Sequence, residues 1–305
     1  MKILGATEKP FAPVAVQGIR EVIAEGGHEL VLLEKGTREQ LLEAVKDVAG
    51  LIVRSDKIDK EVMDAAPELK VIVRAGAGYD NIDLAEATAH GICVMNTPGQ
   101  NANAVAELVM GMLVTLIRNR YNGTSGTELL GKKLGIHAYG AVGRNVARIA
   151  KGFGMEVSAL DPWVKDETME ADGIHPVHSV EELYANNQYV SLHIPATAET
   201  RGSVNKVLIT SLPKNGVLIN AARKEVMDEA GLAEALAERA DLRYVADVKP
   251  DNAADLEAQY PDRVFFTPKK MGAQTAEANI NAGLAAARQV VAHLKDGWNR
   301  FQVNK

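Results

Sequence analysis

Apolar runs alternate with amphipathic stretches along almost the whole chain. The short runs are typical of strands buried on both faces. They lie at residues 2–6, 29–33, 50–53, 70–74, 91–95, 133–137, 156–160, 188–194, 216–220, 242–247 and 263–266. Segments with helical spacing of apolar residues fall between them, among them 12–26, 38–48, 59–66 and 229–239. Strands alternating with helices indicate parallel sheets covered on both faces, and their number favours two α/β domains.

Two longer helical stretches bear on how these domains are joined. Residues 101–119 are apolar almost all round, which indicates a buried helix, and we interpret it as a joint between domains or subunits. Residues 275–295 are rich in alanine and are expected to return to the first domain.

A glycine turn stands out between two of the predicted strands. Residues 138–143 (AYGAVG) follow an apolar run and precede a helical stretch at 144–153. This order is typical of a βαβ unit that binds a dinucleotide. Gly140 would let the backbone approach a pyrophosphate, and Gly143 would let helix and strand pack closely. The helix N-terminus would offer N–H groups to the phosphates.

The acid after the next strand bears on which dinucleotide fits. Asp161 follows the apolar run at 157–160, where a carboxylate can accept hydrogen bonds from a ribose 2′-OH. It would repel a 2′-phosphate, so NAD(H) is favoured over NADP(H). The motif departs from the usual pattern because Ala138 stands in place of its first glycine. A glycine turn formed for packing reasons alone is the competing interpretation.

Composition restricts the class of protein. The 305 residues are 47% hydrophobic and 24% charged, with a formal net charge of −6, which argues against a general binder of nucleic-acid backbones. The single cysteine, Cys93, lies in an apolar run, so a disulfide framework is excluded and a cytoplasmic location is expected. We interpret Cys93 as a buried apolar side chain. No stretch reaches membrane-spanning length, and the N-terminus resembles a first strand more than a signal peptide.

Six motifs occur in an order that a known family shares. They are residues 74–83 (RAGAGYDNID), 96–99 (NTPG), 138–143 (AYGAVG), 190–195 (VSLHIP), 218–223 (LINAAR) and 272–278 (GAQTAEA). On these motifs the chain resembles the D-isomer-specific 2-hydroxyacid dehydrogenases over nearly its full length. Within that family it looks most like the short-form phosphoglycerate dehydrogenases.

The resemblance implies a particular domain arrangement. It predicts two doubly wound, Rossmann-like parallel-sheet domains, with the nucleotide domain inserted into the substrate domain. The substrate domain would comprise residues 1–97 and 279–305, and the NAD-binding domain residues 98–278. A homodimer through the nucleotide domains and an active site between the two domains are also implied. The chain ends soon after its last predicted helix, so we expect no appended regulatory domain.

Anion binding is expected in the first domain. The small residues Ala75, Gly76, Ala77 and Gly78 could present backbone N–H groups to a substrate carboxylate. A plain turn before a helix capped by Asp80 or Asn81 is the alternative. The resemblance favours the carboxylate, and it assigns the substrate phosphate to Arg54, which ends an apolar strand. A solvated strand-end arginine is the alternative there, and Lys9 is a weaker candidate for the same anion.

Candidate catalytic and cofactor residues follow strands of the second domain. Arg223 follows the strand at 216–220, and a guanidinium there can grip a carboxylate and polarise the adjacent carbonyl. A surface arginine is the alternative, and the resemblance favours the catalytic role. The resemblance places these residues at the cofactor: Tyr139, Gly140, Ala141, Val142, Gly143, Asp161, His193, Ala221, Ala222 and Asp247. His137 is interpreted as a core or near-cofactor histidine, and no metal site is expected.

The chain departs from the family where the proton is transferred. The family has a histidine in a motif like T-P-H-x-G, whereas residues 267–272 read TPKKMG. Aligning from the glycine puts Lys270 at the histidine position, which we prefer, and aligning from the proline puts Lys269 there. The family's partner glutamate falls on Asn252, with Asp251 one step away. A lysine base needs a pKa below its usual value, which a neighbouring carboxylate would oppose.

The resemblance, together with these residues, implies an NAD-dependent dehydrogenase that interconverts 3-phosphoglycerate and 3-phosphohydroxypyruvate in serine biosynthesis. Another small 2-hydroxy or 2-oxo acid, such as hydroxypyruvate or glyoxylate, is an alternative substrate. A non-catalytic NADH-sensing protein is the alternative of a different class. The expected partner is a small-molecule substrate, with no nucleic acid and no membrane.

Overall fold

The computed structural model describes residues 1–8 and 10–304. The chain forms two compact units, unit 1 from Met1–Asn101 with Gln274–Lys305 and unit 2 from Ala102–Ala273. Each unit is built on a parallel sheet with helices on both faces, which confirms the predicted fold class. Unit 2 is shorter at both ends than the span of 98–278 expected from the sequence. Within the described residues, no helix combines the length and apolar character needed to cross a membrane.

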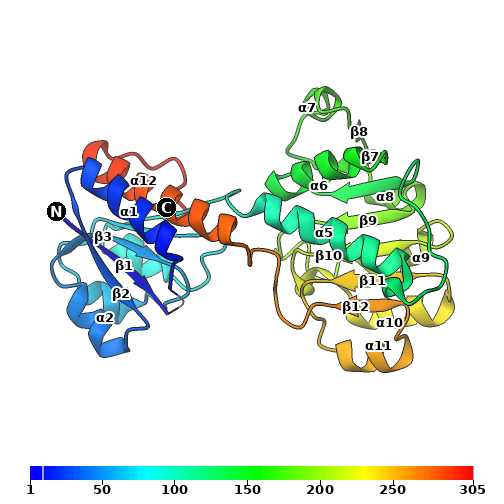
Figure 1. Cartoon of the computed structure of the whole chain (residues 1–305), viewed down its shortest axis with the longest axis horizontal. Helices are drawn as coiled ribbons and strands as arrows, with labels where there is room; N and C mark the ends of the chain where they lie inside the picture. Colours follow the sequence, from blue (N-terminus) through cyan, green and yellow to red (C-terminus); the bar gives the residue numbers. More distant parts are fainter. Residues whose placement is uncertain (9, 305) are drawn as a thin grey trace. The chain divides into compact units, whose positions relative to one another are not determined.

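The sheet of unit 1 has the strand order β2-β1-β3-β4-β5. Its strands are β1 (Lys2–Thr7), β2 (Glu29–Glu34), β3 (Val48–Val53), β4 (Val71–Arg74) and β5 (Cys93–Asn96). Helices α1 (Pro13–Glu25) and α12 (Ala276–Asp296) pack on one face and on each other. Helices α2 (Arg38–Ala44), α3 (Lys60–Asp64) and α4 (Leu84–Ala89) cover the other face. The C-terminal helix therefore completes the unit that the N-terminal strands begin (Figure 1).

Alternation along β3 explains why both faces need helices. Leu51 and Val53 belong to the apolar cluster under α2, α3 and α4, whereas Ile52 belongs to the cluster under α1 and α12. Successive side chains of a strand point to opposite faces, so an all-apolar strand is stable only between two covered faces. Cys93 lies in the second of these clusters with 8% of its surface exposed, and burial raises the pKa of its thiol.

The sheet of unit 2 has the order β12-β11-β10-β9-β6-β7-β8, with every pair parallel. Its strands are β6 (Lys133–His137), β7 (Glu156–Leu160), β8 (His175–Pro176), β9 (Tyr189–Leu192), β10 (Val217–Asn220), β11 (Arg243–Ala246) and β12 (Val264–Phe266). All except β8 fall on runs that the sequence pattern predicts. Strand β8 has two residues, too few to show a period.

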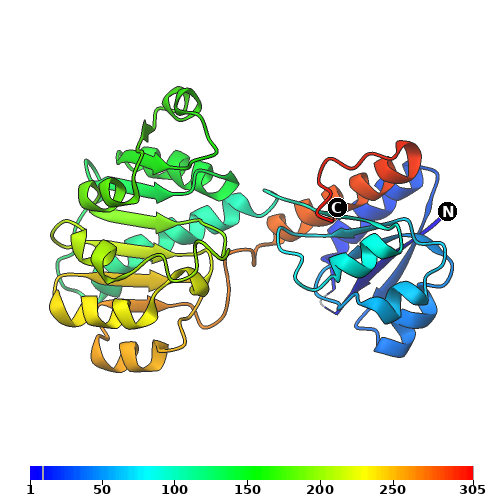
Figure 2. The same cartoon turned by 180° about the vertical axis from the view of Figure 1, so that it is seen from behind.

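Helices cover both faces of this sheet too. Figure 1 shows α5 (Ala102–Ile117) and α6 (Ala141–Gly152) in front of the strands. Figure 2 brings the opposite face forward, with α8 (Val180–Asn186), α10 (Glu229–Glu238) and α11 (Ala253–Gln259). Helix α9 (Lys206–Ser211) packs between α8 and α10, and α7 (Asp166–Ala171) lies by β8. Two 3-10 turns, η1 (Asn119–Tyr121) and η2 (Lys224–Val226), complete the unit.

The interpretation of residues 101–119 as a joint between domains is corrected. Helix α5 begins where the chain enters unit 2, but its buried side chains belong to the core of that unit. It packs against α6 on one side and against β10, β11 and β12 on another. A helix held between a sheet and another helix is apolar on most of its faces without any further partner.

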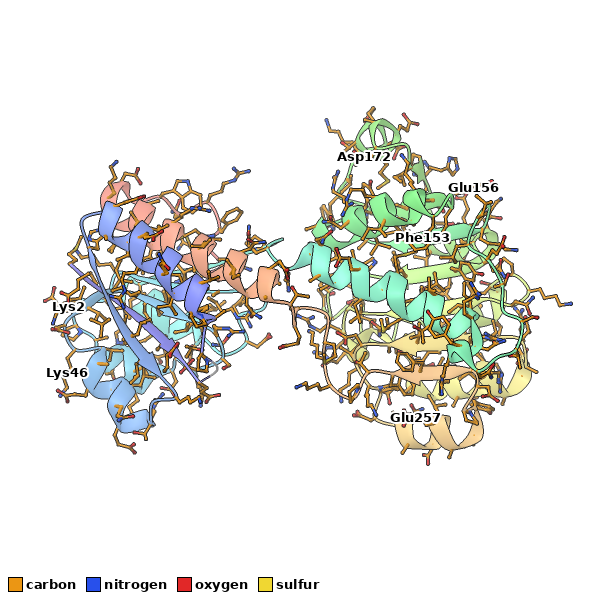
Figure 3. All side chains as sticks on the ribbon, in the orientation of Figure 1. Lys2, Lys46, Phe153, Glu156, Asp172 and Glu257 are labelled. Carbon is orange, nitrogen blue, oxygen red and sulfur yellow. The ribbon has the colours of Figure 1, made fainter. Side chains whose placement is uncertain are left out.

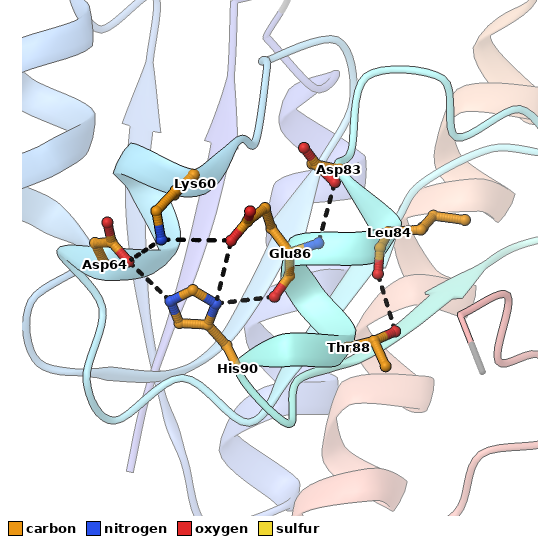
Figure 4. Close-up of polar contacts among 7 residues, drawn as sticks. All are labelled: Lys60, Asp64, Asp83, Leu84, Glu86, Thr88 and His90. Atoms are coloured by element: carbon orange, nitrogen blue, oxygen red, sulfur yellow. Dashed lines mark hydrogen bonds and ion pairs between the residues drawn. The ribbon is translucent and has the colours of Figure 1, made fainter.

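A polar cluster ties α3 to α4 in unit 1 (Figure 4). Asp64 accepts from Lys60 and lies 2.9 Å from Nε2 of His90, whose Nδ1 lies 2.8 Å from the backbone oxygen of Glu86. These two contacts, led by the Glu86 carbonyl, raise the pKa of His90. The hydrogen bond from His90 is the first cause that lowers the pKa of Asp64.

Candidate active site

The carboxyl edge of the unit 2 sheet carries nearly all the candidate residues of that unit. The segments that follow β6, β7, β9, β10, β11 and β12 begin with Ala138, Asp161, His193, Ala221, Asp247 and Thr267, respectively. Because parallel strands end at the same edge, these segments lie side by side. The strand order reverses between β6 and β9, and ligands of doubly wound sheets bind at such a reversal. The topology therefore gathers residues that are far apart in the sequence.

The glycine turn after β6 has the geometry that its sequence predicts, with one strained position. Ala138 has φ +84°, a conformation that glycine adopts without cost, and its N–H donates to the Leu160 carbonyl at 2.9 Å. Gly143 packs so tightly that a Cβ there would lie 2.3 Å from the Ala138 oxygen. A Cβ at Gly140 would meet nothing within 4 Å, so the backbone there is open to a ligand.

The start of α6 suits a pyrophosphate. The residue before the helix, Gly140, provides no side-chain cap, and the first turn contains no acidic residue. The first N–H groups of a helix have no intrahelical acceptor, so they are available to an anion together with the positive end of the helix dipole. The residues present therefore fit the phosphates of a dinucleotide.

Asp161 is fixed in place by two backbone amides. Its Oδ2 accepts from the N–H of Tyr139 at 2.8 Å, and its Oδ1 accepts from the N–H of Trp163 at 2.9 Å. Each carboxylate oxygen has two acceptor positions, so the group can still accept from a ribose hydroxyl. The contact with Tyr139 ties the acid of β7 directly to the glycine turn.

Tyr139 uses both of its donors inside the protein. Its hydroxyl donates to Oδ2 of Asp172 at 2.9 Å, and the Arg144 guanidinium binds the same oxygen at 3.1 Å and covers the tyrosine ring. Burial is the main cause that raises the pKa of Tyr139 to about 12. Asp172 follows α7, which Figure 3 shows above α6. A cavity of about 390 Å³ beside these residues is also lined by Arg148 and Lys151. Tyr139 would thus influence cofactor binding through the shape of the glycine turn that its hydrogen bonds stabilise.

Arg223 is held by a turn that Asn220 organises. The buried amide of Asn220 accepts from the N–H of Ala222 at 3.0 Å and donates to the Arg223 carbonyl at 2.9 Å. The guanidinium donates to the Ala222 carbonyl at 2.9 Å and forms no ion pair with any described residue. It is therefore a cation available to an anionic ligand. Asn220 is absent from the sequence-based candidates, although a polar residue that ends an apolar strand is the signal that could have identified it.

The two candidate lysines lie in an anchored segment. Lys269 and Lys270 are exposed, and both follow β12. Asp247, 2% exposed, accepts from the Thr267 hydroxyl at 2.9 Å and from the N–H groups of Met271 and Gly272 at 2.6 and 2.8 Å. The sequence assigned the Asp247 carboxylate to the cofactor. In the structure this carboxylate binds the segment that carries the two lysines.

The positions considered for the partner acid have other contacts. Asp251 forms an ion pair with Lys224 at 2.5 Å, on an exposed surface. The Asn252 side chain donates to the Glu229 carbonyl at 3.0 Å, and its buried Oδ1 has no hydrogen-bond partner among the described residues. Asn252 is therefore held by the start of α10.

Two histidines lie beneath the same edge and are uncharged at neutral pH. Burial lowers the pKa of His137 to about 4 and that of His193 to about 3. The Nε2 of His193 lies 3.0 Å from the Ser191 hydroxyl, and Nδ1 of His137 lies 3.4 Å from the Tyr184 hydroxyl. A proton-transfer role near neutral pH does not suit groups with such low pKa values.

The carboxyl edge of the unit 1 sheet carries two arginines. Arg54 follows β3, and its guanidinium contacts the Pro10 carbonyl, the Asn279 side chain and the ring of Phe11. Arg74 ends β4 and donates to the Arg54 carbonyl at 3.1 Å. Burial lowers the pKa of both, and for Arg74 the charge of Arg54 adds to this effect. Arg74 is absent from the sequence-based candidates, while Lys9 lies outside the described residues.

The small-residue loop after β4 is partly committed to the protein. The N–H groups of Ala75 and Gly76 donate to the carbonyls of Val53 and Arg74. Those of Ala77 and Gly78 have no acceptor among the described residues, so the candidate carboxylate nest narrows to these two. Gly76 has φ +148°, and a Cβ there would lie 1.5 Å from the Arg74 guanidinium. Glycine at this position therefore leaves room for the arginine.

Comparison with known proteins identifies the family. Residues 103–269 match the model of the D-isomer specific 2-hydroxyacid dehydrogenase, NAD binding domain. The chain belongs to the D-isomer specific 2-hydroxyacid dehydrogenase family. Unit 2 is the NAD-binding domain of this family, which makes NAD the cofactor. In the described part of the chain, no cluster of three or more His, Cys, Asp or Glu residues could hold a metal ion.

Several relatives of this dehydrogenase family carry one name. A D-3-phosphoglycerate dehydrogenase of Methanocaldococcus jannaschii is 37% identical over 269 residues, which is 83% of this chain and 51% of that protein. The D-3-phosphoglycerate dehydrogenase of Homo sapiens is 33% identical over 90% of this chain and 54% of that protein. This chain therefore spans about half the length of the curated relatives that it matches.

A solved structure matches over the full length. It is a cofactor (NAD+) bound 3-phosphoglycerate dehydrogenase in Entamoeba histolytica, 47% identical, with a TM-score of 0.87. The match covers 100% of this chain and 99% of that chain. The fold and the family are thus shared along the entire sequence.

Proposed function

We propose that this protein is an NAD-dependent D-3-phosphoglycerate dehydrogenase of serine biosynthesis that works as a homodimer. The observation that carries the substrate is the pair Arg54 and Arg74 at the carboxyl edge of unit 1. In the same loop region, the amides of Ala77 and Gly78 have no acceptor among the described residues. Two anion-binding elements in one unit suit a substrate that has both a phosphate and a carboxylate. The names of the relatives support the same substrate.

The chain's own residues supply binding and proton transfer. A bound NAD would supply the hydride chemistry at substrate C2, as acceptor in the oxidation and as donor in the reduction. Arg223 orients the substrate and polarises the C2 oxygen, which its guanidinium, without an ion pair among the described residues, can do bidentately. Lys270 takes the proton of the C2 hydroxyl during oxidation and gives it back during reduction, with Lys269 as the alternative.

A lysine base sets a condition on its surroundings. The free side chain has a pKa of about 10.4, so oxidation near neutral pH needs desolvation or positive neighbours to release the proton. The partner acid of the histidine enzymes would act in the opposite direction, and the chain has Asn252 at that register. Loss of the carboxylate is therefore consistent with a lysine in place of the histidine.

The lysines also favour a second candidate, a non-catalytic NADH-sensing protein. Both are exposed in unit 2, which is a poor environment for a base at neutral pH. Such a protein would bind NADH and turn over no 2-oxo acid. A reductase of hydroxypyruvate or glyoxylate is a third possibility, and it would gain nothing from Arg54 and Arg74.

The test is NADH oxidation by the purified protein with 3-phosphohydroxypyruvate, hydroxypyruvate and glyoxylate. We expect kcat/KM to be highest for the phosphorylated acid and to fall at least a hundredfold in Lys270→Ala, with NADH binding by fluorescence unchanged. Equal kcat/KM for all three acids would refute the substrate assignment. NADH binding without any turnover would favour the sensing protein. Sedimentation of the same sample tests the homodimer.

A further inference from the structure

The buried carboxylate of Asp247 binds both ends of the segment that carries the two candidate lysines. Asp247 follows β11, and its own N–H donates to the Asn220 carbonyl at 3.0 Å, which fixes its backbone to β10. Its Oδ1 accepts from the Thr267 hydroxyl and the Met271 N–H, and its Oδ2 accepts from the Gly272 N–H. The segment 267–272 is thus bound at its start and at its end to the same side chain.

The contact leaves little freedom at the end of the segment. A Cβ at Gly272 would lie 3.0 Å from Oδ2 of Asp247 and 3.2 Å from Val105 of α5. The glycine therefore allows the backbone to come within hydrogen-bonding distance of the carboxylate. Thr267 also donates to the Asp247 carbonyl at 3.1 Å, so the start of the segment has a second bond to the same residue.

We propose that Asp247 is a positioning residue that fixes segment 267–272 and thereby sets where its lysines are held. The inference rests on the proposed function, because it gives those lysines the proton-transfer role. Hydrogen bonds to an ionised acceptor are roughly twice as strong as neutral ones. Three such bonds use three of the roughly four acceptor positions of a carboxylate, which leaves about one for the cofactor.

The anchoring also distinguishes Lys270 from Lys269 as the proton-transfer group. Lys270 directly precedes Met271, whose amide is bound by Asp247 at 2.6 Å. Lys269 lies one residue further from this anchor, next to Pro268. A group that transfers a proton must be held close to one geometry, because a misplacement of about 1 Å can cost a hundredfold in rate. The better anchored backbone is that of Lys270, which agrees with the alignment from the glycine side.

The kinetic test uses two variants of Thr267 and one of Asp247. Thr267→Val removes the hydroxyl donor with little change in volume, and Thr267→Ser keeps it. We expect kcat for 3-phosphohydroxypyruvate to fall about tenfold in Thr267→Val and about a hundredfold in Asp247→Asn, as for residues that support a reacting group. The KM for the acid should stay within about twofold, and the pH midpoint of kcat should move. Thr267→Ser should retain at least half of kcat. Unchanged kcat and pH profile in Asp247→Asn would overturn the inference.

Limited trypsin digestion tests the same point without any turnover. Trypsin cleaves after lysine, so cleavage after Lys269 and Lys270 reports directly on the order of the segment. In Asp247→Asn we expect this cleavage to accelerate at least tenfold, while cleavage after the exposed Lys35 of unit 1 keeps its rate. Equal acceleration at both places would indicate general unfolding and overturn the positioning role. A protein without turnover whose segment loosens selectively would refute the proposed function and retain Asp247 as the anchor.

Discussion

The carbonyl oxygen of Ala138 lies so near Gly143 that a Cβ on the glycine would be 2.3 Å from it. Ala138 turns the chain through φ +84°, and the first turn of α6 then passes directly over the end of β6. The two positions share one tight bend. Glycine is present where packing leaves no space, and alanine is present where only the backbone angle favours glycine.

Replacing the alanine of this bend should stabilise the protein. An L-residue in the left-handed region costs about 1–2 kcal/mol, so Ala138→Gly is expected to raise the free energy of unfolding by about 1 kcal/mol after the greater flexibility of the unfolded chain is offset. Gly143→Ala should lower it by about 1–3 kcal/mol and weaken NADH binding, because α6 has to move. Urea denaturation measures both. A stabilised Gly143→Ala would contradict the described bend.

The charge and fork geometry of Arg223 should both matter to catalysis. Its guanidinium forms no ion pair with any described residue, so removal leaves no buried partner charge behind. We expect Arg223→Gln to lower kcat/KM for 3-phosphohydroxypyruvate by about 10²–10³-fold, and Arg223→Lys to recover only part of it. Thermal unfolding should change little. Full activity in the lysine variant would show that the bidentate contact is not needed.

The arginine pair of unit 1 should determine the preference for a phosphorylated acid. Arg54→Gln is expected to raise the KM for 3-phosphohydroxypyruvate at least tenfold and to leave the KM for hydroxypyruvate nearly unchanged, because the lost ion pair involves the phosphate. Arg74→Gln should act in the same direction and also destabilise unit 1, since it donates to the Arg54 carbonyl. Equal rises in KM for both acids would exclude the phosphate role.

Cofactor choice should depend on the carboxylate of Asp161. Asp161→Ser removes the negative charge and should improve kcat/KM with NADPH while it lowers that with NADH. The two amides that this carboxylate binds, those of Tyr139 and Trp163, lose an acceptor, so some loss of stability is expected as well. Steady-state assays with both cofactors decide the matter. If the ratio of kcat/KM with NADPH to kcat/KM with NADH did not change, the ribose would not be bound by Asp161.

The His90 cluster should make unit 1 sensitive to pH. The pKa of His90 is raised in the folded state, so its contribution is complete below the unfolded value of about 6.5 and is lost as pH rises through the folded value. The midpoint of thermal unfolding should therefore fall between pH 6 and pH 8 by more in the wild type than in His90→Gln (Figure 4). Identical pH dependence in the two proteins would show that this histidine contributes nothing.

The strands could be predicted because burial on both faces leaves a clear apolar run. The same runs also indicated candidate site residues, since Arg54 and Arg223 each follow such a run at the carboxyl edge of their own sheet. Arg74 and Asn220 carry an equivalent signal, each as the polar residue that ends a strand, and it was available in the sequence. The contacts of Asp247 could not be predicted in this way, because they join residues 24 and 25 positions apart through the shape of one loop. The local pattern of apolar and polar residues does not specify the shape of this loop.

Unit 1 is assembled from both ends of the chain, and this has a consequence for synthesis. Helix α12 packs on α1 and β3, so the N-terminal strands leave the ribosome long before the helix that covers their exposed face. Unit 2 is continuous and can fold as soon as it has emerged. Its folding also brings the two parts of unit 1 together, which lowers the entropic cost of joining them. The nascent N-terminal segment therefore exposes an apolar surface until α12 has emerged, and that interval is when a chaperone would bind it.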